Sequence, residues 1–172
     1  MTWTMVLYAA LIGVGAVAAA ALLAYLVGLC LPRRHRQSAE RVLTLTPDEA
    51  WAKITDFARY PHWQPWLDRV ERLRGKGDTV GVVWRHVERK GEHLDLEVAA
   101  WQADRKLMLR TADPSLPFRG TWILEVEPCL GGCKVSVVEE GEVPGPLMRT
   151  MWRLFGPRKS AAERFLEALE GS

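Results

Sequence analysis

The first 32 residues contain no Lys, Arg, Asp or Glu, so all 23 basic and 21 acidic residues lie in residues 33–172. The net charge of +2 therefore belongs to that part alone, where the two signs are interspersed. A nearly neutral composition of this kind gives no general case for nucleic-acid binding, and we predict no nucleic-acid partner. With eight Trp and 48% hydrophobic residues, the chain is not a disordered one either.

Cysteine is scarce, because the chain holds only Cys30, Cys129 and Cys133. Three are too few for a disulfide scaffold. Cys129 and Cys133 could face each other across a hairpin, and the sequence leaves open whether they pair. No His or Cys pair has the spacing of a zinc site, so we predict reduced cysteines, no metal and no cofactor.

Catalytic signatures are also missing. No Ser/His/Asp or Cys/His set has a recognisable spacing, and the glycines of residues 74–78 (RGKGD) are typical of a hairpin rather than a phosphate loop. His86, Glu97 and Arg110 fall on predicted strands, where solvated or hydrogen-bonded sheet residues are the expected role. The sequence therefore favours a protein that is not an enzyme, without excluding one.

The longest hydrophobic run is Met5 to Leu31, 27 residues without a charge. As a helix it would measure roughly 40 Å, more than the roughly 30 Å of a bilayer's hydrocarbon core. A cleaved signal peptide is the alternative, but no basic region precedes the run and no clear small-residue cleavage site ends it. We predict a retained transmembrane helix over residues 1–31.

Residues 32–39 form a basic juxtamembrane linker in this interpretation, with Arg33, Arg34 and Arg36 following the apolar run at once. The positive-inside rule then predicts a single-pass membrane protein with its domain, residues 40–172, facing the cytoplasm. Ala20, Ala24 and Gly28 form a row of small residues that could pair two helices into a homodimer.

Residues 44–67 (TLTPDEAWAKITDFARYPHWQPWL) predict a strand end, a helix and an aromatic segment. Thr46, Pro47 and Glu49 have the spacing of a capping box with proline in the first turn. The helix is expected to fray by Tyr60, before Pro61. The aromatic segment after it is predicted to be neither regular helix nor central strand, and its apolar area requires a large surface to lie on.

The remainder predicts an antiparallel meander followed by a helix. Residues 41–46 are the expected first strand, and residues 70–73, 79–87, 93–102, 106–111, 118–127 and 134–142 the later ones, separated by turn residues. From Leu147 the period becomes helical, with an apolar stripe that runs to Leu169. Gly156 and Pro157 interrupt that stripe, so a kink or break is expected there.

The order of strand, helix opening with Pro47, and D-x-x-x-Y-P-x-W-x-P resembles the SRPBCC superfamily, also called START-like, Bet v 1-like or polyketide cyclase/dehydrase. The matching residues are Pro47, Trp51, Asp56, Tyr60, Pro61, Trp63 and Pro65. The resemblance implies an α+β helix-grip fold, in which a curved antiparallel sheet wraps around a long C-terminal helix. It spans about residues 41–169 and implies a cavity between sheet and helix.

The residues expected to line that cavity are mostly aromatic or flexible, which suits an adaptable apolar pocket. They are Trp63, Trp66, Trp84, His86, Trp122, Met148, Met151, Trp152 and Phe155. Ordinary core packing is the plainer role for any one of them.

Three functions remain open at this stage. The first is a membrane-anchored domain that binds a hydrophobic small molecule or lipid. The second is an enzyme of cyclase or dehydrase type, which would need an acid and a base converging on the pocket. The third is a protein-interaction module with a solid core.

Overall fold

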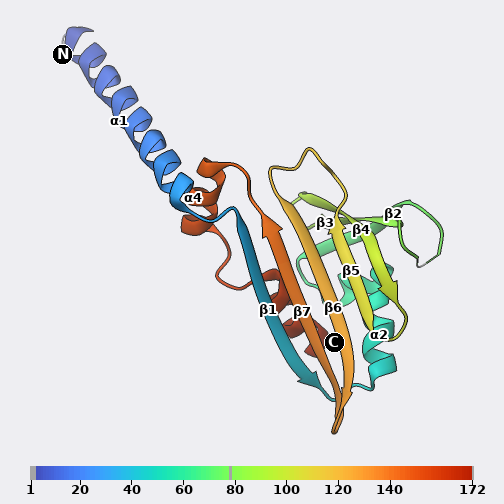
Figure 1. Cartoon of the computed structure of the whole chain (residues 1–172). Coiled ribbons are helices and arrows are strands. Elements are labelled where there is room, and N and C mark those ends of the chain that lie inside the picture. The colour runs from blue at the N-terminus through green and yellow to red at the C-terminus, as the bar shows by residue number, and fades with distance from the viewer. Residues whose placement is uncertain (1–2, 78, 172) are drawn as a thin grey trace. The chain divides into compact units, whose positions relative to one another are not determined.

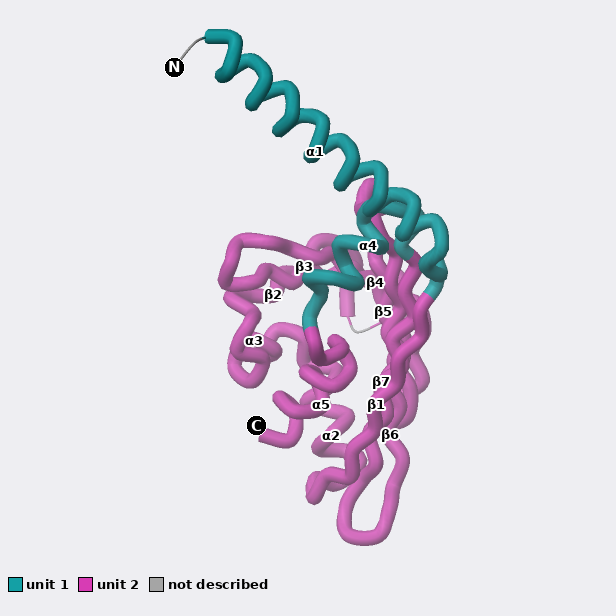
Figure 2. Tube along the Cα trace, turned by 90° about the vertical axis from the view of Figure 1, so that its left-hand side faces the viewer, with its two compact units in different colours: residues 1–34, 143–157 teal, residues 35–142, 158–172 magenta. Residues whose placement is uncertain are grey.

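The computed structural model describes residues 3–77 and 79–171, which divide into two compact units. The first unit comprises residues 1–34 and 143–157, and the second comprises residues 35–142 and 158–172 (Figure 2). The chain thus leaves the sheet-bearing unit after the last strand, contributes one helix to the first unit, and returns.

The elements follow one another in the order that the sequence predicts, one N-terminal helix before an α+β arrangement (Figure 1). They are α1 (Trp3–Cys30), β1 (Arg34–Leu43), α2 (Pro47–Thr55), the 3-10 helix η1 (Phe57–Arg59), α3 (Tyr60–Trp63), β2 (Leu67–Arg74), β3 (Val83–Glu88), β4 (His93–Gln102), β5 (Lys106–Thr111), β6 (Arg119–Cys129), β7 (Gly132–Glu142), α4 (Pro146–Phe155) and α5 (Ala161–Glu170).

The seven strands form one curved sheet in the order β1-β7-β6-β5-β4-β3-β2. Strands β2 to β7 pair antiparallel with their neighbours in sequence, which is the predicted meander. The boundaries of β4 and β5 agree with the expected ones because alternating side chains and flanking turn residues mark both strands clearly. The expected α+β fold with a curved antiparallel sheet is confirmed.

Helix α2 begins as its sequence predicts. The Thr46 hydroxyl accepts a hydrogen bond from the Glu49 backbone N–H, and the Glu49 carboxylate accepts one from the Thr46 backbone N–H at 2.8 Å. This reciprocal pair satisfies two backbone donors that the first turn leaves unpaired. The Thr46 backbone N–H and the Thr46 hydroxyl both donate to the Glu49 carboxylate, and these bonds hold the pKa of Glu49 below its usual range.

The aromatic segment after α2 is more helical than expected. Helix α2 ends at Thr55, and the chain then forms η1 and a single α-helical turn, α3, with Pro61 in that turn. Proline is tolerated in a first helical turn because its missing N–H would have no intrahelical partner there. The segment lies on the sheet: Tyr60 is buried, and its hydroxyl donates to the Ile54 carbonyl oxygen at 2.5 Å.

The core lies on one face of the sheet, covered by α2, the aromatic segment and α5 (Figure 1). From α2 it takes Ala50 and Ile54, and from α5 Leu166 and Leu169, all nearly inaccessible to water. The strands contribute alternate residues, since only one side of each pleated strand faces the helices.

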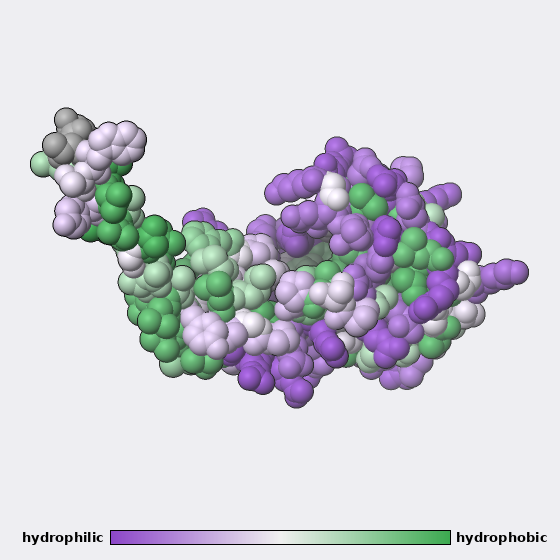
Figure 3. Space-filling model, turned by 90° about the horizontal axis from the view of Figure 1, so that it is seen from above, coloured by the Kyte–Doolittle hydropathy of each residue, from purple (hydrophilic) through white to green (hydrophobic). Residues whose placement is uncertain are grey.

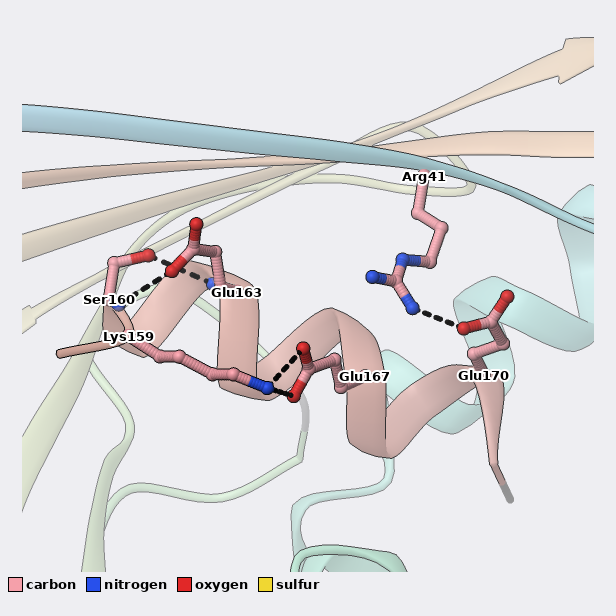
Figure 4. A network of polar contacts seen from close by, with 6 residues as sticks. All are labelled: Arg41, Lys159, Ser160, Glu163, Glu167 and Glu170. Carbon is pink, nitrogen blue, oxygen red and sulfur yellow. Dashed lines mark hydrogen bonds and ion pairs between the residues drawn. The ribbon is translucent and has the colours of Figure 1, made fainter.

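Polar contacts fix α5 within this unit (Figure 4). Ser160 and Glu163 form a second capping box, Lys159 pairs with Glu167 at 2.8 Å, and Arg41 of β1 pairs with Glu170. The pair between Arg41 and Glu170 thereby connects the first strand to the C-terminal helix.

Strand β1 begins earlier than predicted. The sequence suggests a linker at residues 32–39 and a strand at residues 41–46, whereas the strand runs from Arg34 to Leu43. Its first six residues (RHRQSA) show no hydrophobic alternation, because β1 is an edge strand and edge strands carry charged residues that oppose further pairing.

The first unit consists of α1 and α4. Helix α1 is apolar on every side, and Figure 3 shows hydrophobic residues along it. Helix α4 ends at Phe155, so the C-terminal stripe is broken at Gly156 and Pro157 as the sequence predicts. The stripe is therefore divided between two helices that belong to different units.

Candidate functional site

Strand β3 carries Trp84 and His86 on the face of the sheet that bears the core. The two residues pair with Leu96 and Leu94 of β4, so all four side chains share one side of the pleat. Trp84 and His86 are both buried. A buried histidine on an apolar face is unusual, so the hydrogen-bond partners of its ring nitrogens need to be identified.

Aromatic rings from the segment after α2 surround this pair. The Phe57 ring lies 5.3 Å from the Trp84 ring, and the Tyr60 ring lies 5.6 Å from the His86 ring, centroid to centroid. These separations are typical of favourable aromatic contacts. The guanidinium of Arg72, on the neighbouring strand β2, lies 4.5 Å from the Trp84 ring centroid.

Two polar atoms in this apolar environment have no hydrogen-bond partner among the described residues, Trp84 Nε1 and His86 Nε2. A buried polar group without a partner costs about 1–3 kcal/mol, so such atoms are uncommon in a settled core. Burial also lowers the pKa of His86 to about 4, which keeps the imidazole neutral near pH 7. The pair can accept and donate hydrogen bonds without a charge.

Trp63 and Trp66 extend the aromatic wall from α3 to the start of β2. The Trp63 ring packs edge-on against Tyr60 at 4.9 Å and against Phe165 of α5 at 5.2 Å. The Arg164 guanidinium lies 5.4 Å from the Trp66 ring centroid. Both tryptophans are half-buried against the core rather than free on the surface.

Trp122 lies on β6, opposite Leu109 of β5 and Glu139 of β7. Its ring covers Gly120, where an added Cβ would lie 2.6 Å from the ring. The absence of a side chain at Gly120 therefore allows the indole to lie flat along the sheet. Glu139, on the same face, accepts a hydrogen bond from the Ala161 backbone N–H at the start of α5.

The four other predicted cavity residues, Met148, Met151, Trp152 and Phe155, lie on α4 in the first unit. All four are exposed, Phe155 to 77%. Their assignment to the cavity stays a prediction.

One polar residue of this region escaped the sequence analysis. Gln64 is buried and its Nε2 has no hydrogen-bond partner among the described residues, like the two atoms on β3. The available signal was a lone amide between Trp63 and Pro65, in a segment otherwise dominated by aromatic residues and proline.

The polar residues that an enzyme would need do not converge. Glu97 pairs with Val83 across β3 and β4, so it lies on the opposite face of the sheet from His86. There it binds the Arg110 guanidinium at 3.1 Å. Arg85 and Asp95 share that outer face in a two-bond ion pair, which lowers the pKa of Asp95.

Within residues 3–77 and 79–171, no group of three or more His, Cys, Asp and Glu side chains is arranged to hold a metal ion. All three cysteines are free thiols, and Cys133 opposes Pro128 rather than Cys129 in the β6–β7 hairpin. Burial raises the pKa of the Cys133 thiol, which suits a structural residue.

Comparison with known protein families identifies the family to which the chain belongs. A family model described as polyketide cyclase/dehydrase and lipid transport matches residues 34–170. No curated protein matches the chain significantly. Helix α1 lies outside the matched range, and by length and composition it is the one described helix that could cross a membrane.

Solved structures with the same fold come from several organisms. A protein from Mesorhizobium loti has a TM-score of 0.62 and 21% identity, covering 80% of this chain and 95% of that one. A START superfamily protein from Mycobacterium smegmatis has a TM-score of 0.59 and 16% identity, covering 81% and 96%. Norcoclaurine synthase from Thalictrum flavum has a TM-score of 0.62 and 14% identity, covering 80% and 85%. These identities support the fold alone.

Proposed function

Because the chain belongs to the polyketide cyclase/dehydrase and lipid transport family, we propose that its sheet-bearing unit binds a hydrophobic small molecule or lipid. The binding region is the helix-covered face of the sheet, with Trp63, Trp66, Trp84, His86 and Trp122 in contact with the ligand. The single observation that carries this proposal is the buried, unpartnered pair of ring nitrogens on Trp84 and His86.

The pair also limits the chemistry of the ligand. Trp84 Nε1 can only donate, so it requires an oxygen acceptor, and the neutral His86 can donate or accept according to its tautomer. Burying a carboxylate there would be costly without a buried cation. A long apolar molecule that ends in a hydroxyl or carbonyl oxygen fits these requirements best.

The test compares three probes that share one isoprenoid chain: farnesol, farnesoic acid and the hydrocarbon farnesene. Each is incubated with the full-length chain in detergent micelles, and the retained mass is measured by native mass spectrometry. Farnesol is expected to be retained most. Equal retention of farnesol and farnesene, or retention of none of the three, would contradict the proposal.

A matched pair of variants locates the site. Trp84→Phe removes the indole N–H and keeps an aromatic ring, so it should abolish the preference for farnesol over farnesene. Trp101→Phe is the control, since that residue packs edge-on against Trp51 on another part of the core. If both variants behave alike, the ligand does not bind at β3.

A catalytic function of cyclase or dehydrase type is the weaker alternative. His86 is the one buried titratable group among the candidates, and Glu97 lies across the sheet from it. Acid–base catalysis needs both groups within reach of the same substrate atoms. A protein-interaction module is also less well supported, since Trp63 and Trp66 are packed against the core.

Anchorage by α1 is the second part of the proposal. The helix spans 28 residues without a charged side chain, and Arg33, Arg34 and Arg36 follow it, so the domain would face the cytoplasm. Intact mass measurement of the chain from membranes tests this directly. A chain that has lost α1 would indicate a cleaved signal sequence instead, and protease protection of a C-terminal tag in inside-out vesicles would reverse the orientation.

A further inference from the structure

Helix α4 has a polar face and an apolar face. The apolar face is the exposed one, which is the reverse of a surface helix in a soluble protein. At about 100° per residue, Arg149, Thr150 and Arg153 fall on one side. The opposite side carries only apolar residues: Leu147, Met148, Met151, Trp152, Leu154 and Phe155. Arg149 and Thr150 are buried, whereas every apolar residue of the other face is exposed, Leu154 to 65%.

Arg149 and Thr150 are buried because this side of α4 packs on the C-terminal end of α1, within the first unit. The Thr150 hydroxyl donates to the Ala24 carbonyl oxygen at 2.6 Å, and the Arg149 guanidinium donates to the Leu31 carbonyl oxygen. A Cβ added at Gly28 would lie 1.9 Å from the Pro146 carbonyl oxygen. The two helices thus run antiparallel, since four residues forward on α4 correspond to four residues back on α1.

This packing gives the small residues of α1 a role within the chain. Ala24 and Gly28 belong to the small-residue row that could pair two copies, and here they admit α4 instead. The C-terminal end of α1 leaves carbonyl oxygens without intrahelical partners, and Arg149 donates to the carbonyl oxygen of Leu31, just after the last helical residue. Arg149 and Thr150 of α4 form their hydrogen bonds to the end of α1. Only the apolar side of α4 is therefore left to contact another partner.

The occupant of that apolar side follows from its continuity with α1. The surface of α1 is apolar all round, and the exposed face of α4 extends it beside residues 24–28. Exposure of an apolar face of this size to water is unfavourable. Lipid acyl chains can bury it without a further protein partner. The basic residues at the same end of α1, Arg33 and Arg34, suit the phosphate layer next to those chains.

We propose that α4 is a membrane-inserted amphipathic helix, docked beside α1 with Leu147, Met151, Leu154 and Phe155 among the lipid acyl chains. This inference rests on the proposed anchorage by α1 and adds a second contact with the bilayer. Trp152, at the edge of the apolar face, has the side chain typical of the interface. Arg153 is exposed, and its long apolar stem allows its guanidinium to extend to the headgroups.

The chain passes three times between the first unit and the sheet-bearing unit. The chain enters that unit from α1 through Arg34 and returns to the first unit at Val143, whose backbone N–H donates to the Arg33 carbonyl oxygen at 2.9 Å. It enters again after Pro157.

The experiment uses the full-length chain with Cys30, Cys129 and Cys133 replaced, in vesicles of phosphatidylcholine and phosphatidylglycerol. Single cysteines carry a nitroxide label, and electron paramagnetic resonance compares accessibility to oxygen, which concentrates in the bilayer, with accessibility to a water-soluble nickel chelate. Phe155→Cys reports the apolar face of α4, and Arg153→Cys reports the opposite face of the same helix. Leu11→Cys reports the N-terminal half of α1, and Leu130→Cys, in the fully exposed β6–β7 turn, is the aqueous reference.

The expected result is an oxygen-to-nickel ratio at Phe155→Cys several-fold above those at Arg153→Cys and Leu130→Cys. A ratio at Phe155→Cys equal to that at Leu130→Cys, with Leu11→Cys still oxygen-accessible, would overturn the insertion of α4 and leave the anchor in place. Nickel access at Leu11→Cys would overturn the anchor, and the insertion of α4 with it. Leu147→Cys repeats the measurement at the start of α4 if the Phe155 label disturbs folding.

Discussion

The hydroxyl of Thr150 donates a hydrogen bond to the carbonyl oxygen of Ala24 at 2.6 Å, although 126 positions separate the two residues in the chain. The contact is specific because it coincides with a close approach of backbones at Gly28 and Pro146. A hydroxyl that bonds a helix carbonyl is a common way to join helices in a membrane, where water offers no competing partner.

The close approach at Gly28 predicts a selective effect of larger side chains. Gly28→Leu should displace α4 from α1, because the new Cβ would collide with the Pro146 carbonyl oxygen. Leucine forms helix better than glycine by about 0.8–1 kcal/mol, so weakening of α1 cannot be the cause. The measurement is disulfide cross-linking between Ala24→Cys and Thr150→Cys in a chain without its natural cysteines.

Gly13→Leu is the matched control, since nothing lies within 4 Å of a Cβ added at Gly13. The cross-link should form in the parent chain and in the Gly13 variant and be lost in the Gly28 variant. Undiminished cross-linking in the Gly28 variant would show that α4 does not dock on α1 as described.

The buried His86 predicts a pH dependence of stability. Its pKa is lowered by burial from 6.5 to about 4 in the folded chain, so between these values the unfolded chain binds a proton that the folded one does not. The free energy of unfolding should therefore fall as the pH falls from 6.5 to 4. At about 1.4 kcal/mol per pKa unit, the loss approaches about 3 kcal/mol.

Urea unfolding of the full-length chain in detergent, followed by Trp fluorescence at several pH values, measures this loss. His86→Gln should flatten the curve between pH 6.5 and 4.5, while His62→Gln, at an exposed position, should not. The lowered pKa of carboxylates such as Asp95 adds a loss only at lower pH, below their unfolded pKa near 4. An unchanged slope in His86→Gln would mean that the imidazole is not buried.

Local sequence signals were sufficient for much of the fold. Thr46 and Glu49 form the predicted capping box because both partners lie within one helical turn. The strands β4 and β5 could be placed because alternation and turn residues are also local properties. The start of β1 at Arg34 could not be placed from the sequence. Its first residues are polar, and its pairing depends on β7, a strand about a hundred residues away.

The candidate site was less accessible to sequence reasoning. Trp84 and His86 share a face of β3 because they lie two residues apart, and strand periodicity alone decides that. The apolar stripe from Leu147 to Leu169 was predicted to face inward on both sides of a kink or break at Gly156 and Pro157, whereas α5 buries its part and α4 exposes its own. A break at Pro157 could be predicted from the sequence. The different burial of the two helices could not, because hydrophobicity alone does not distinguish a protein core from acyl chains.

The hydroxyl of Tyr60 predicts a measurable contribution to stability. It donates to the Ile54 carbonyl oxygen inside the core, and burial raises the pKa of the phenol, so it remains a donor at ordinary pH. Tyr60→Phe should lower the free energy of unfolding by about 1–2 kcal/mol, because it leaves that buried carbonyl without this donor. Tyr8→Phe, on the exposed surface of α1, is the control in the same urea titration. Equal midpoints for the two variants would contradict the role given to Tyr60.

The ion pair between Arg85 and Asp95 lies on the outer face of the sheet. We predict that its coupling free energy is larger than that of an ordinary surface ion pair. Two parallel hydrogen bonds of 2.7 and 2.8 Å join the guanidinium to the carboxylate, and the Asp95 side chain is only 14% exposed. A double-mutant cycle with Arg85→Met and Asp95→Asn should give a coupling energy of about 1 kcal/mol, the upper end for partly exposed pairs.

The pair between Lys134 and Glu127 is the control, because it has one contact of 2.8 Å and a more exposed carboxylate. Its cycle, with Lys134→Met and Glu127→Gln, should give a coupling near zero, since solvent and salt screen exposed charges. Both pairs join neighbouring antiparallel strands, so a difference between the two cycles isolates burial and bidentate geometry as its cause. Equal coupling energies would mean that the Arg85–Asp95 geometry adds nothing, and that this sheet is held by its core face alone.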